Sequence, residues 1–249
     1  MGMMCTPWRT DKDEILETGI FRTFEGGDGS GKTTHMRFLA ESLRARGTEV
    51  VCLREPGGTI IGERLRNVVL DPGNDAMTSE CELLIYEAAR AQIVGRVVRP
   101  ALERGAVVLC DRYSDSTIAY QSFGRGLDRG FIERANNFAC QGVYPRRTIL
   151  MQTGGSAEEG LVRASHRAGA DRLELAGVAF HERVNAGYLQ LAREFPERIR
   201  IVVSDKEKSE TARRVFAELS DLFPWMGDQT VCTPAFFARA NVKPYEMGM

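Results

Sequence analysis

The residues best suited to chemistry lie near the start of the chain, in the glycine-rich run GGDGSGKTT. The run fits G-x-x-x-x-G-K-[ST], in which backbone N–H groups surround phosphate oxygens, a lysine reaches the outer phosphates and a hydroxyl binds Mg²⁺. A strand-like segment precedes the run and a helical pattern follows it, which is the context that the loop requires. We therefore predict the phosphate-binding loop of a nucleotide site, made of Gly26, Gly27, Asp28, Gly29, Ser30, Gly31, Lys32, Thr33 and Thr34.

A second polar group follows the apolar run AVVLC, where Asp111 and Arg112 stand at the end of a predicted strand. A carboxylate in that position beside a phosphate loop is the usual partner of Mg²⁺, so we predict a metal site made by Thr33 and Asp111. A buried guanidinium needs an anion, and phosphate fits its planar fork. The alternative is an ion pair between Asp111 and Arg112 that closes the strand.

Arg54 and Glu55 follow another predicted strand. In a parallel sheet, the carboxyl ends of the strands face one crevice, so these side chains should approach the phosphate loop. The alternative is a Pro-Gly turn with a solvated ion pair. Arg66, in the next predicted helix, fits a solvated helix face equally well when considered alone.

Two further groups suit the recognition of a base. Tyr86 and Arg90 are four residues apart in a helical pattern, so they share a face on which a ring can stack and its edge can be bonded. A core tyrosine with a surface arginine is the alternative. The polar residues Thr117, Tyr120 and Gln121 suit a polar ring edge, although a polar helix start explains them equally well.

Arg163 and Arg167 lie one helical turn apart in a segment bounded by Gly160 and Gly169. A mobile segment that carries arginines is what phosphoryl transfer uses to shield and neutralise phosphates, so we predict a lid over residues 154–174. The alternative is an ordinary basic helix face.

The composition narrows the class of protein. A formal net charge of −1 argues against nucleic acid or an anionic membrane as the main partner. Six scattered cysteines without a C-x-x-C pair indicate a reducing, cytoplasmic location, and no stretch is apolar enough to span a membrane. Residues 1–19 are predicted to be a flexible extension, residues 20–224 one P-loop domain and residues 225–249 a tail of uncertain order.

Short apolar strands alternate with longer helical patterns, which predicts an α/β fold with a parallel sheet. The expected strands are 20–25, 49–54, 106–111, 148–153 and 198–203. The expected helices are 33–46, 60–70, 80–104 (bent or interrupted by Pro100), 131–140, 156–168, 178–194 and 207–222.

Taken together, these motifs resemble the thymidylate kinase family. The resemblance covers about residues 21–203 and rests on FEGGDGSGKTT, REPGGT, ELLIYEAARAQ, DRYSDSTIAYQ and GLVR followed by DRLE. It implies the P-loop nucleoside monophosphate kinase fold, with a five-stranded parallel sheet flanked by helices, a mobile lid and a homodimer. The chain departs from the family pattern at Arg146, Arg147 and Gln152.

The resemblance also assigns roles to residues. Asp28 matches the aspartate that contacts the 3′-hydroxyl of dTMP, and Arg112 matches the arginine that holds the acceptor phosphate. Because Ser30 stands where some members carry a loop arginine, the chain resembles the bacterial class that places its arginines in the lid. The predicted dTMP-binding set is Asp28, Arg54, Glu55, Arg66, Tyr86, Arg90, Arg112, Thr117, Tyr120 and Gln121.

We therefore expect phosphorylation of dTMP to dTDP, a step in dTTP synthesis, with ATP as co-substrate and Mg²⁺ as cofactor. The alternatives are a kinase for another nucleoside monophosphate, a P-loop ATPase that acts mechanically on a partner, and a nucleotide-binding protein without catalysis. A homodimer with neither a nucleic-acid nor a membrane partner is expected. The predicted catalytic residues are Lys32, Arg112, Arg163 and Arg167.

Overall fold

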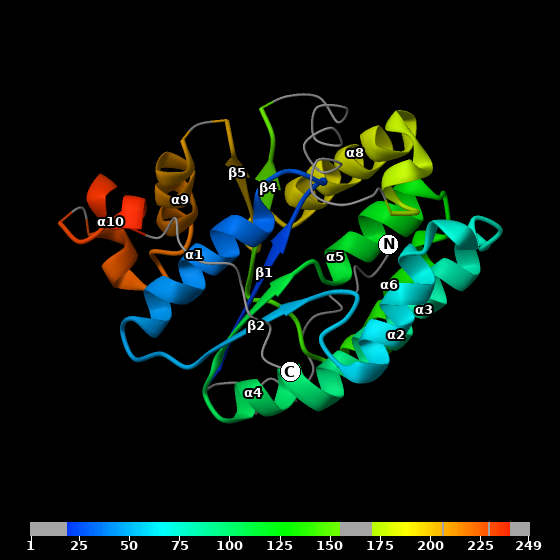
Figure 1. Cartoon of the computed structure of the whole chain (residues 1–249), viewed down its shortest axis with the longest axis horizontal. Coiled ribbons are helices and arrows are strands. Elements are labelled where there is room, and N and C mark those ends of the chain that lie inside the picture. Colours follow the sequence, from blue (N-terminus) through cyan, green and yellow to red (C-terminus); the bar gives the residue numbers. More distant parts are fainter. Residues whose placement is uncertain (1–18, 155–170, 206, 229, 240–249) are drawn as a thin grey trace, which may run out of the picture.

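Five parallel strands form the centre of the fold (Figure 1). The computed structural model describes residues 19–154, 171–205, 207–228 and 230–239. The strand order β2-β3-β1-β4-β5 places the strand that leads into the phosphate loop in the middle and confirms the predicted α/β sheet. The strands are β1 (Ile20–Glu25), β2 (Val50–Arg54), β3 (Val107–Asp111), β4 (Arg147–Gln152) and β5 (Ile199–Val203).

The register of the three neighbouring strands β2, β3 and β1 brings their last residues to one edge of the sheet. Asp111 of β3 pairs with Arg54 of β2 on one side and with Phe24 of β1 on the other. Every residue of β3 is buried, as expected for an internal strand of a sheet that is covered on both faces. The polar residues that follow the three strands therefore share one edge.

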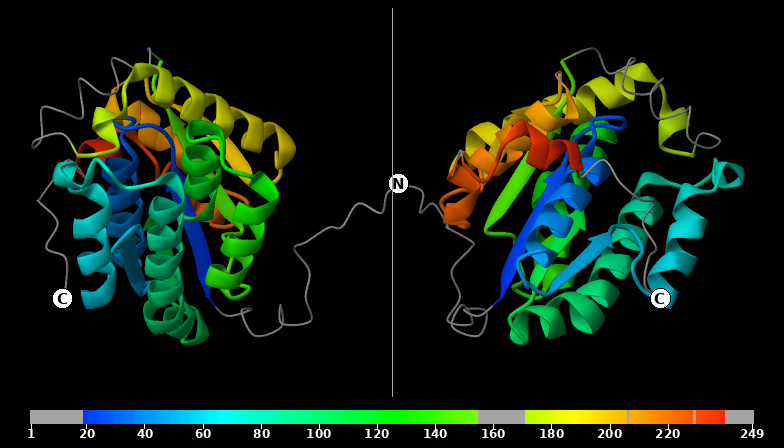
Figure 2. Two further views of the ribbon diagram at one scale, coloured as in Figure 1. Left: turned by 90° about the vertical axis from the view of Figure 1, so that its right-hand side faces the viewer. Right: turned by 60° about the vertical axis from the view of Figure 1, so that its left-hand side comes forward.

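Helices cover both faces of this sheet (Figure 2). Phe24, Ile149 and Met151 point to one face and pack with the helices that follow β1 and β5. Phe21 and Leu150 point to the other face, where two further apolar clusters form. The first face is covered by α1 (Lys32–Arg44) and α9 (Lys208–Ala217), and the second by α3 (Ser79–Ile93), η4 (Ile118–Gly124) and α8 (Val178–Glu194).

Two further helices, α2 (Ile60–Leu70) and α6 (Arg129–Cys140), pack against α3 and belong to the second layer. Within the described residues, no helix has both the length and the apolar character that a bilayer crossing requires. The other described elements are η2 (Pro72–Asn74), η3 (Val94–Val98), α4 (Arg99–Glu103), α5 (Ser114–Thr117), η5 (Glu174–Ala176), η6 (Pro224–Gly227) and α10 (Pro234–Arg239).

The long predicted helix 80–104 is interrupted, but the interruption begins before Pro100. The α-helical hydrogen bonding of α3 ends at Ile93, and a wider π-helical segment (η3) leads into the short helix α4. Pro100 has no N–H, and its ring would clash with the carbonyl group of Arg96, four residues earlier, which lies inside the wider segment. The helix predicted at 156–168 lies outside the described residues.

The described residues beyond 224 pack against the domain. Phe237 is buried and stacks on Phe38 of α1, with ring centroids 5.1 Å apart. The guanidinium of Arg46 lies 3.5 Å from the ring centre of Trp225, a cation–π contact. The described part of the tail whose order the sequence leaves uncertain therefore contributes apolar side chains to the core around α1.

Candidate active site

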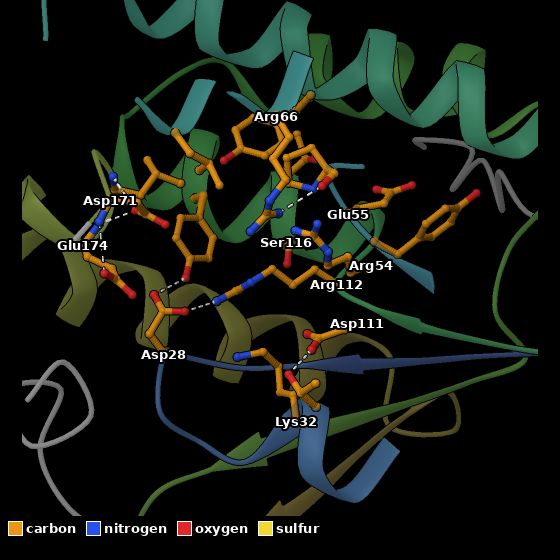
Figure 3. Close-up of a pocket in the computed structure, with 18 of the residues that line it drawn as sticks. Asp28, Lys32, Arg54, Glu55, Arg66, Asp111, Arg112, Ser116, Asp171 and Glu174 are labelled. Carbon is orange, nitrogen blue, oxygen red and sulfur yellow. Dashed lines mark hydrogen bonds and ion pairs between the residues drawn. The ribbon is translucent and has the colours of Figure 1, made fainter. Parts of the chain in front are cut away.

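A cavity of about 390 Å³ opens at the carboxyl ends of β1, β2 and β3 (Figure 3). Its position follows from the register, because each of these strands ends at or next to polar residues that the sequence singled out. It is lined by Asp28, Gly29, Gly31, Lys32, Thr33, Arg54, Glu55, Pro56, Arg66, Leu70, Tyr86, Arg90, Asp111, Arg112, Tyr113, Ser116, Thr117, Tyr120, Gln121, Asp171, Leu173 and Glu174.

The predicted phosphate loop links β1 to α1. Gly31 has a φ of 91° and precedes α1 without a side-chain cap, so the first N–H groups of the helix are not capped by that residue. A Cβ atom at Gly26 would lie 2.1 Å from the Met151 carbonyl oxygen, so only glycine fits there. This backbone geometry suits the close approach of an anion.

The Lys32 side chain folds back over the phosphate loop. Its ammonium group donates to the carbonyl oxygens of Gly26, at 2.9 Å, and Gly27, at 2.7 Å. Burial and the nearby Arg112 charge lower the pKa of Lys32 to about 8. The ammonium group is therefore held at the loop by neutral acceptors, from which a phosphate could attract it.

Thr33 and Asp111 provide neighbouring oxygen atoms at the foot of the cavity. The Thr33 hydroxyl donates to Oδ2 of Asp111 at 2.5 Å. Mg²⁺ prefers oxygen ligands and is often held by one or two protein groups together with substrate phosphates and water. Within the described ranges, no group of three His, Cys, Asp or Glu side chains forms a metal cage. The residues fit a Mg²⁺ ion that arrives with a nucleotide.

Arg112 lies between the phosphate loop and the rest of the cavity, as Figure 3 shows. Its guanidinium donates to Asp28 at 2.5 Å and to the Tyr188 hydroxyl at 3.1 Å. Although burial acts in the opposite direction, the charges of Arg112 and Lys32 lower the pKa of Asp28. Arg112 has a φ of 69°, an uncommon backbone conformation for arginine that is often found at functional sites.

Arg90 is the centre of a buried network on the opposite wall. Its side chain is 1% exposed and donates to Glu55 at 2.9 Å and to Glu87 at 2.8 Å. It also donates to Thr117 at 2.9 Å and to Asn136 at 2.7 Å. Although burial acts in the opposite direction, these two carboxylates raise the pKa of Arg90, so it stays charged. The surface-arginine alternative for Arg90 is therefore wrong.

The other predicted acceptor-side residues also line the cavity. The Tyr120 ring lies 4.9 Å from the Arg112 guanidinium carbon, and its hydroxyl is 3.4 Å from Asp28. Gln121 is buried and donates to Glu82 at 2.8 Å. Arg54 donates to Glu63 at 2.9 Å, and Arg66 donates to the Pro56 carbonyl oxygen at 3.0 Å. Tyr86 contributes its ring to the same wall.

The structure does not bring every predicted residue to the cavity wall. Gly26, Gly27, Ser30 and Thr34 belong to the loop and the start of α1 but are not among the lining residues. Arg163 and Arg167 lie outside the described residues, so their roles stay predictions. Of the predicted lid, the structure describes residue 154 and residues 171–174. Three of these residues, Asp171, Leu173 and Glu174, line the cavity.

Sequence reasoning missed the buried groups that support the site. Glu82 is fully buried and accepts hydrogen bonds from Gln121, Arg125 and Arg172. Glu25 is also fully buried, and Tyr188 lies beside it. Each of these glutamates lies inside an apolar sequence pattern, and that position indicates a buried carboxylate that needs several hydrogen-bond donors. The sequence could not identify those donors.

Comparisons with known proteins point to one family. The family described as "Thymidylate kinase" matches residues 24–215. The chain is 46% identical over 202 residues to a thymidylate kinase of Trichlorobacter lovleyi, which covers 79% of this chain and 94% of that protein. It is 48% identical over 198 residues to one of Gloeobacter violaceus, covering 79% and 92% respectively. A crystal structure of thymidylate kinase from Ehrlichia chaffeensis matches with a TM-score of 0.67 and 31% identity, covering 81% of this chain and 98% of that one.

Proposed function

Because the chain belongs to the thymidylate kinase family, we propose that the cavity is where it transfers the γ-phosphoryl group of ATP to dTMP. The enzyme is an ATP-dependent nucleoside monophosphate kinase, and its products are ADP and dTDP. One observation carries the assignment of the site: a phosphate loop and a second, arginine-lined pocket share one cavity, with Arg112 between them.

The donor side consists of the loop and Lys32. The N–H groups at the start of α1 bind the phosphates of ATP, and Lys32 moves from the carbonyl oxygens of the loop to the β- and γ-phosphates. Thr33 and Asp111 would hold Mg²⁺, which when bound supplies positive charge to the phosphates and orients them. No covalent intermediate is needed, because positioning and charge neutralisation account for phosphoryl transfer.

The acceptor side binds dTMP. Arg112 exchanges its contact with Asp28 for the acceptor phosphate, and Asp28 then accepts a hydrogen bond from the 3′-hydroxyl. Tyr86 stacks on the thymine, and Tyr120 lies under the deoxyribose. The remaining N–H of Arg90 reaches the edge of the base, because its other donors are already bonded to Glu55, Glu87, Thr117 and Asn136.

The charged groups on the acceptor side argue against the other functional classes. A mechanical ATPase requires a phosphate loop but has no use for a second pocket with a fully buried arginine. A protein that only binds nucleotide would have no use for a partly buried arginine facing the phosphate loop. The nearest competitor is therefore a kinase for a different nucleoside monophosphate.

A steady-state assay with a panel of nucleoside monophosphates tests the assignment. ADP release would be measured with dTMP, dUMP, dCMP, AMP and GMP at equal concentrations, with Lys32→Ala as the negative control. We expect the highest kcat/KM with dTMP and no appreciable turnover of the two purine nucleotides. A higher kcat/KM for any other acceptor would refute the substrate assignment, and equal ADP release without an acceptor would favour an ATPase.

A homodimer is supported by exposed apolar side chains on one layer of helices. The helix α3 packs between α2 and α6, and all three face the viewer in the left panel of Figure 2. Phe138 of α6 is 85% exposed, and Leu84 of α3 is 56% exposed. Other exposed large apolar residues of this layer are Ile60, Ile61, Val68 and Phe131. A second copy of the chain would remove this apolar surface from water.

Light scattering coupled to size-exclusion chromatography tests the dimer. We expect the wild-type protein to have twice the mass of the chain and Phe138→Glu to shift toward the monomer. Val178→Glu is the matched control, because Val178 is exposed on α8, outside this layer. A wild-type monomer at micromolar concentration would contradict the proposal.

A further inference from the structure

A buried hydroxyl group, that of Tyr188, contacts Arg112 but belongs to a residue that does not line the cavity. Tyr188 of α8 is 2% exposed, and neither it nor Glu25 lines the cavity. The Tyr188 oxygen accepts a hydrogen bond from Nη1 of Arg112 at 3.1 Å and donates to Oε2 of Glu25 at 3.0 Å. It also lies 2.7 Å from the Ser116 hydroxyl. Arg112 is therefore connected to a buried carboxylate through one phenol.

Glu25 holds the whole turn that carries Arg112. Its carboxylate accepts from the backbone N–H of Tyr113 at 2.7 Å and from the Ser116 hydroxyl at 2.5 Å. The backbone N–H of Arg112 donates to the Phe24 carbonyl oxygen at 2.9 Å. Three separate elements, the end of β1, the turn after β3 and the helix α8, therefore meet at the base of this one arginine.

The two contacts of the Arg112 guanidinium differ in kind. The contact with Asp28 lies in the cavity, where a substrate can compete for it. The contact with Tyr188 is made by a residue that does not line the cavity, so it remains available when Asp28 turns to a substrate. A long side chain that is fixed at one end loses less conformational entropy when it binds an anion.

From these contacts we propose that Tyr188 is a positioning residue, which fixes Arg112 for the acceptor phosphate by joining it to Glu25. The inference rests on the acceptor role of Arg112 given under the proposed function. Unlike Asp28, which turns to the substrate, a carboxylate that stayed in direct contact with Arg112 would compete with the phosphate for its charge. The neutral phenol fixes the guanidinium at a hydrogen-bonding distance and leaves its positive charge available. Burial and Glu25 keep the pKa of Tyr188 well above its usual range, so the phenol stays protonated.

The variant Tyr188→Phe tests the inference, because it removes one oxygen atom and keeps the ring packed against Tyr120. We expect the Kd for dTMP to rise about 10-fold, the size of a lost hydrogen bond to a charged group, with the KM for ATP unchanged. The control is Tyr144→Phe, which removes a hydroxyl that bonds Asn137 away from the cavity. We expect this control to bind dTMP as the wild type does.

A double-mutant cycle separates positioning from a general structural role. In an Arg112→Ala background, Tyr188→Phe should change the Kd for dTMP less than 2-fold, because the group that it positions is gone. An equal 10-fold effect in both backgrounds would mean that Tyr188 only stabilises the fold and would overturn the inference. Glu25→Gln should also weaken dTMP binding, and this effect should likewise disappear in the Arg112→Ala background.

The outcomes also distinguish this inference from the proposed function. If Arg112→Ala binds dTMP as tightly as the wild type, the acceptor role of Arg112 is wrong. If Arg112→Ala weakens dTMP binding while Tyr188→Phe does not, only the positioning role fails. Urea unfolding of each variant, with far-UV circular dichroism, verifies that the compared proteins are folded.

Discussion

The two ends of the cavity are built in different ways. At the donor end, the main chain provides the binding groups, and the hydrogen-bond partners of Lys32 among the described residues are two carbonyl oxygens. At the acceptor end, side chains from distant parts of the chain bind one another, with Arg90 bonded to four of them. The donor end therefore depends on local backbone geometry, whereas the acceptor end depends on the folded network.

This difference predicts how each end responds to mutation. A change at the donor end should remove catalysis and leave the fold intact, because few buried partners lose a contact. A change in the acceptor network should reduce stability as well as activity, because it leaves buried charges unpaired. The two kinds of loss can be measured separately.

The largest effect should follow Lys32→Ala. We expect kcat to fall about 10³-fold or more, because the ammonium group meets charge on the transferred phosphoryl group. Urea unfolding should give nearly the wild-type free energy. The matched control is Lys208→Ala, which removes an exposed lysine of α9 and should retain wild-type kcat. Single-turnover phosphoryl transfer by Lys32→Ala at a rate near that of the wild type would contradict the donor role.

Arg90→Ala should show the opposite pattern at the acceptor end. Glu55 and Glu87 would lose their buried partner, so we expect the free energy of unfolding to fall by about 3–5 kcal/mol. In the folded fraction, kcat/KM for dTMP should fall, whereas the KM for ATP should remain unchanged. Arg104→Ala is the control, since its pair with Glu49 is exposed and should contribute less than about 1 kcal/mol. Equal stability of both variants would abolish the distinction between the two ends.

Arg163→Ala tests whether the donor end needs an arginine from the predicted lid. Ser30 gives the phosphate loop no arginine, so we expect kcat to fall by roughly one to three orders of magnitude, with little change in dTMP affinity. The double variant with Arg167→Ala should be slower than either single variant. Pre-steady-state rates near the wild-type value in both variants would assign the catalytic charge to Lys32, Mg²⁺ and Arg112.

The smallest effect should come from the protonation of Glu25. Burial, with the nearby Asp115 charge, raises the pKa of Glu25 from its ordinary value of 4.5 to about 7, although Ser116, Arg112 and Tyr113 act in the opposite direction. The folded protein therefore holds this proton more tightly than the unfolded chain. Its stabilising contribution is complete below about pH 4.5 and is lost as the pH rises through 7.

We expect this contribution to decrease by about 2 kcal/mol between pH 5 and pH 8. Urea unfolding across that range would measure it, with Glu25→Gln as the reference that lacks the titrating group. The free energy of unfolding of the wild type minus that of Glu25→Gln should fall steadily as the pH rises. A difference that does not change with pH would show that Glu25 keeps one protonation state throughout.

The same division explains how much the sequence could reveal. The phosphate loop was predicted correctly as a strand, a turn and a helix start, because its geometry depends on neighbouring residues. Tyr86 and Arg90 were found through their helical spacing, and both line the cavity. The partner Asn136 was not found, since residues 46 positions apart meet only through the fold. Glu87 was also missed, although it lies three residues from Arg90 on the same helix, where helical spacing indicates a contact. The wider helical segment at 94–98 does have a local signal, because the ring of Pro100 would clash with the carbonyl group of Arg96, four residues earlier.

The position of β1 in the sheet has a consequence for the time course of folding. The loop sequence is local, but β1 pairs with β3 at Val107 and with β4 at Arg147, both far along the chain. Contacts between distant residues form slowly, because a long loop must close before they stabilise anything. The site that is easiest to recognise in the sequence should therefore be among the last to become able to bind ATP during refolding.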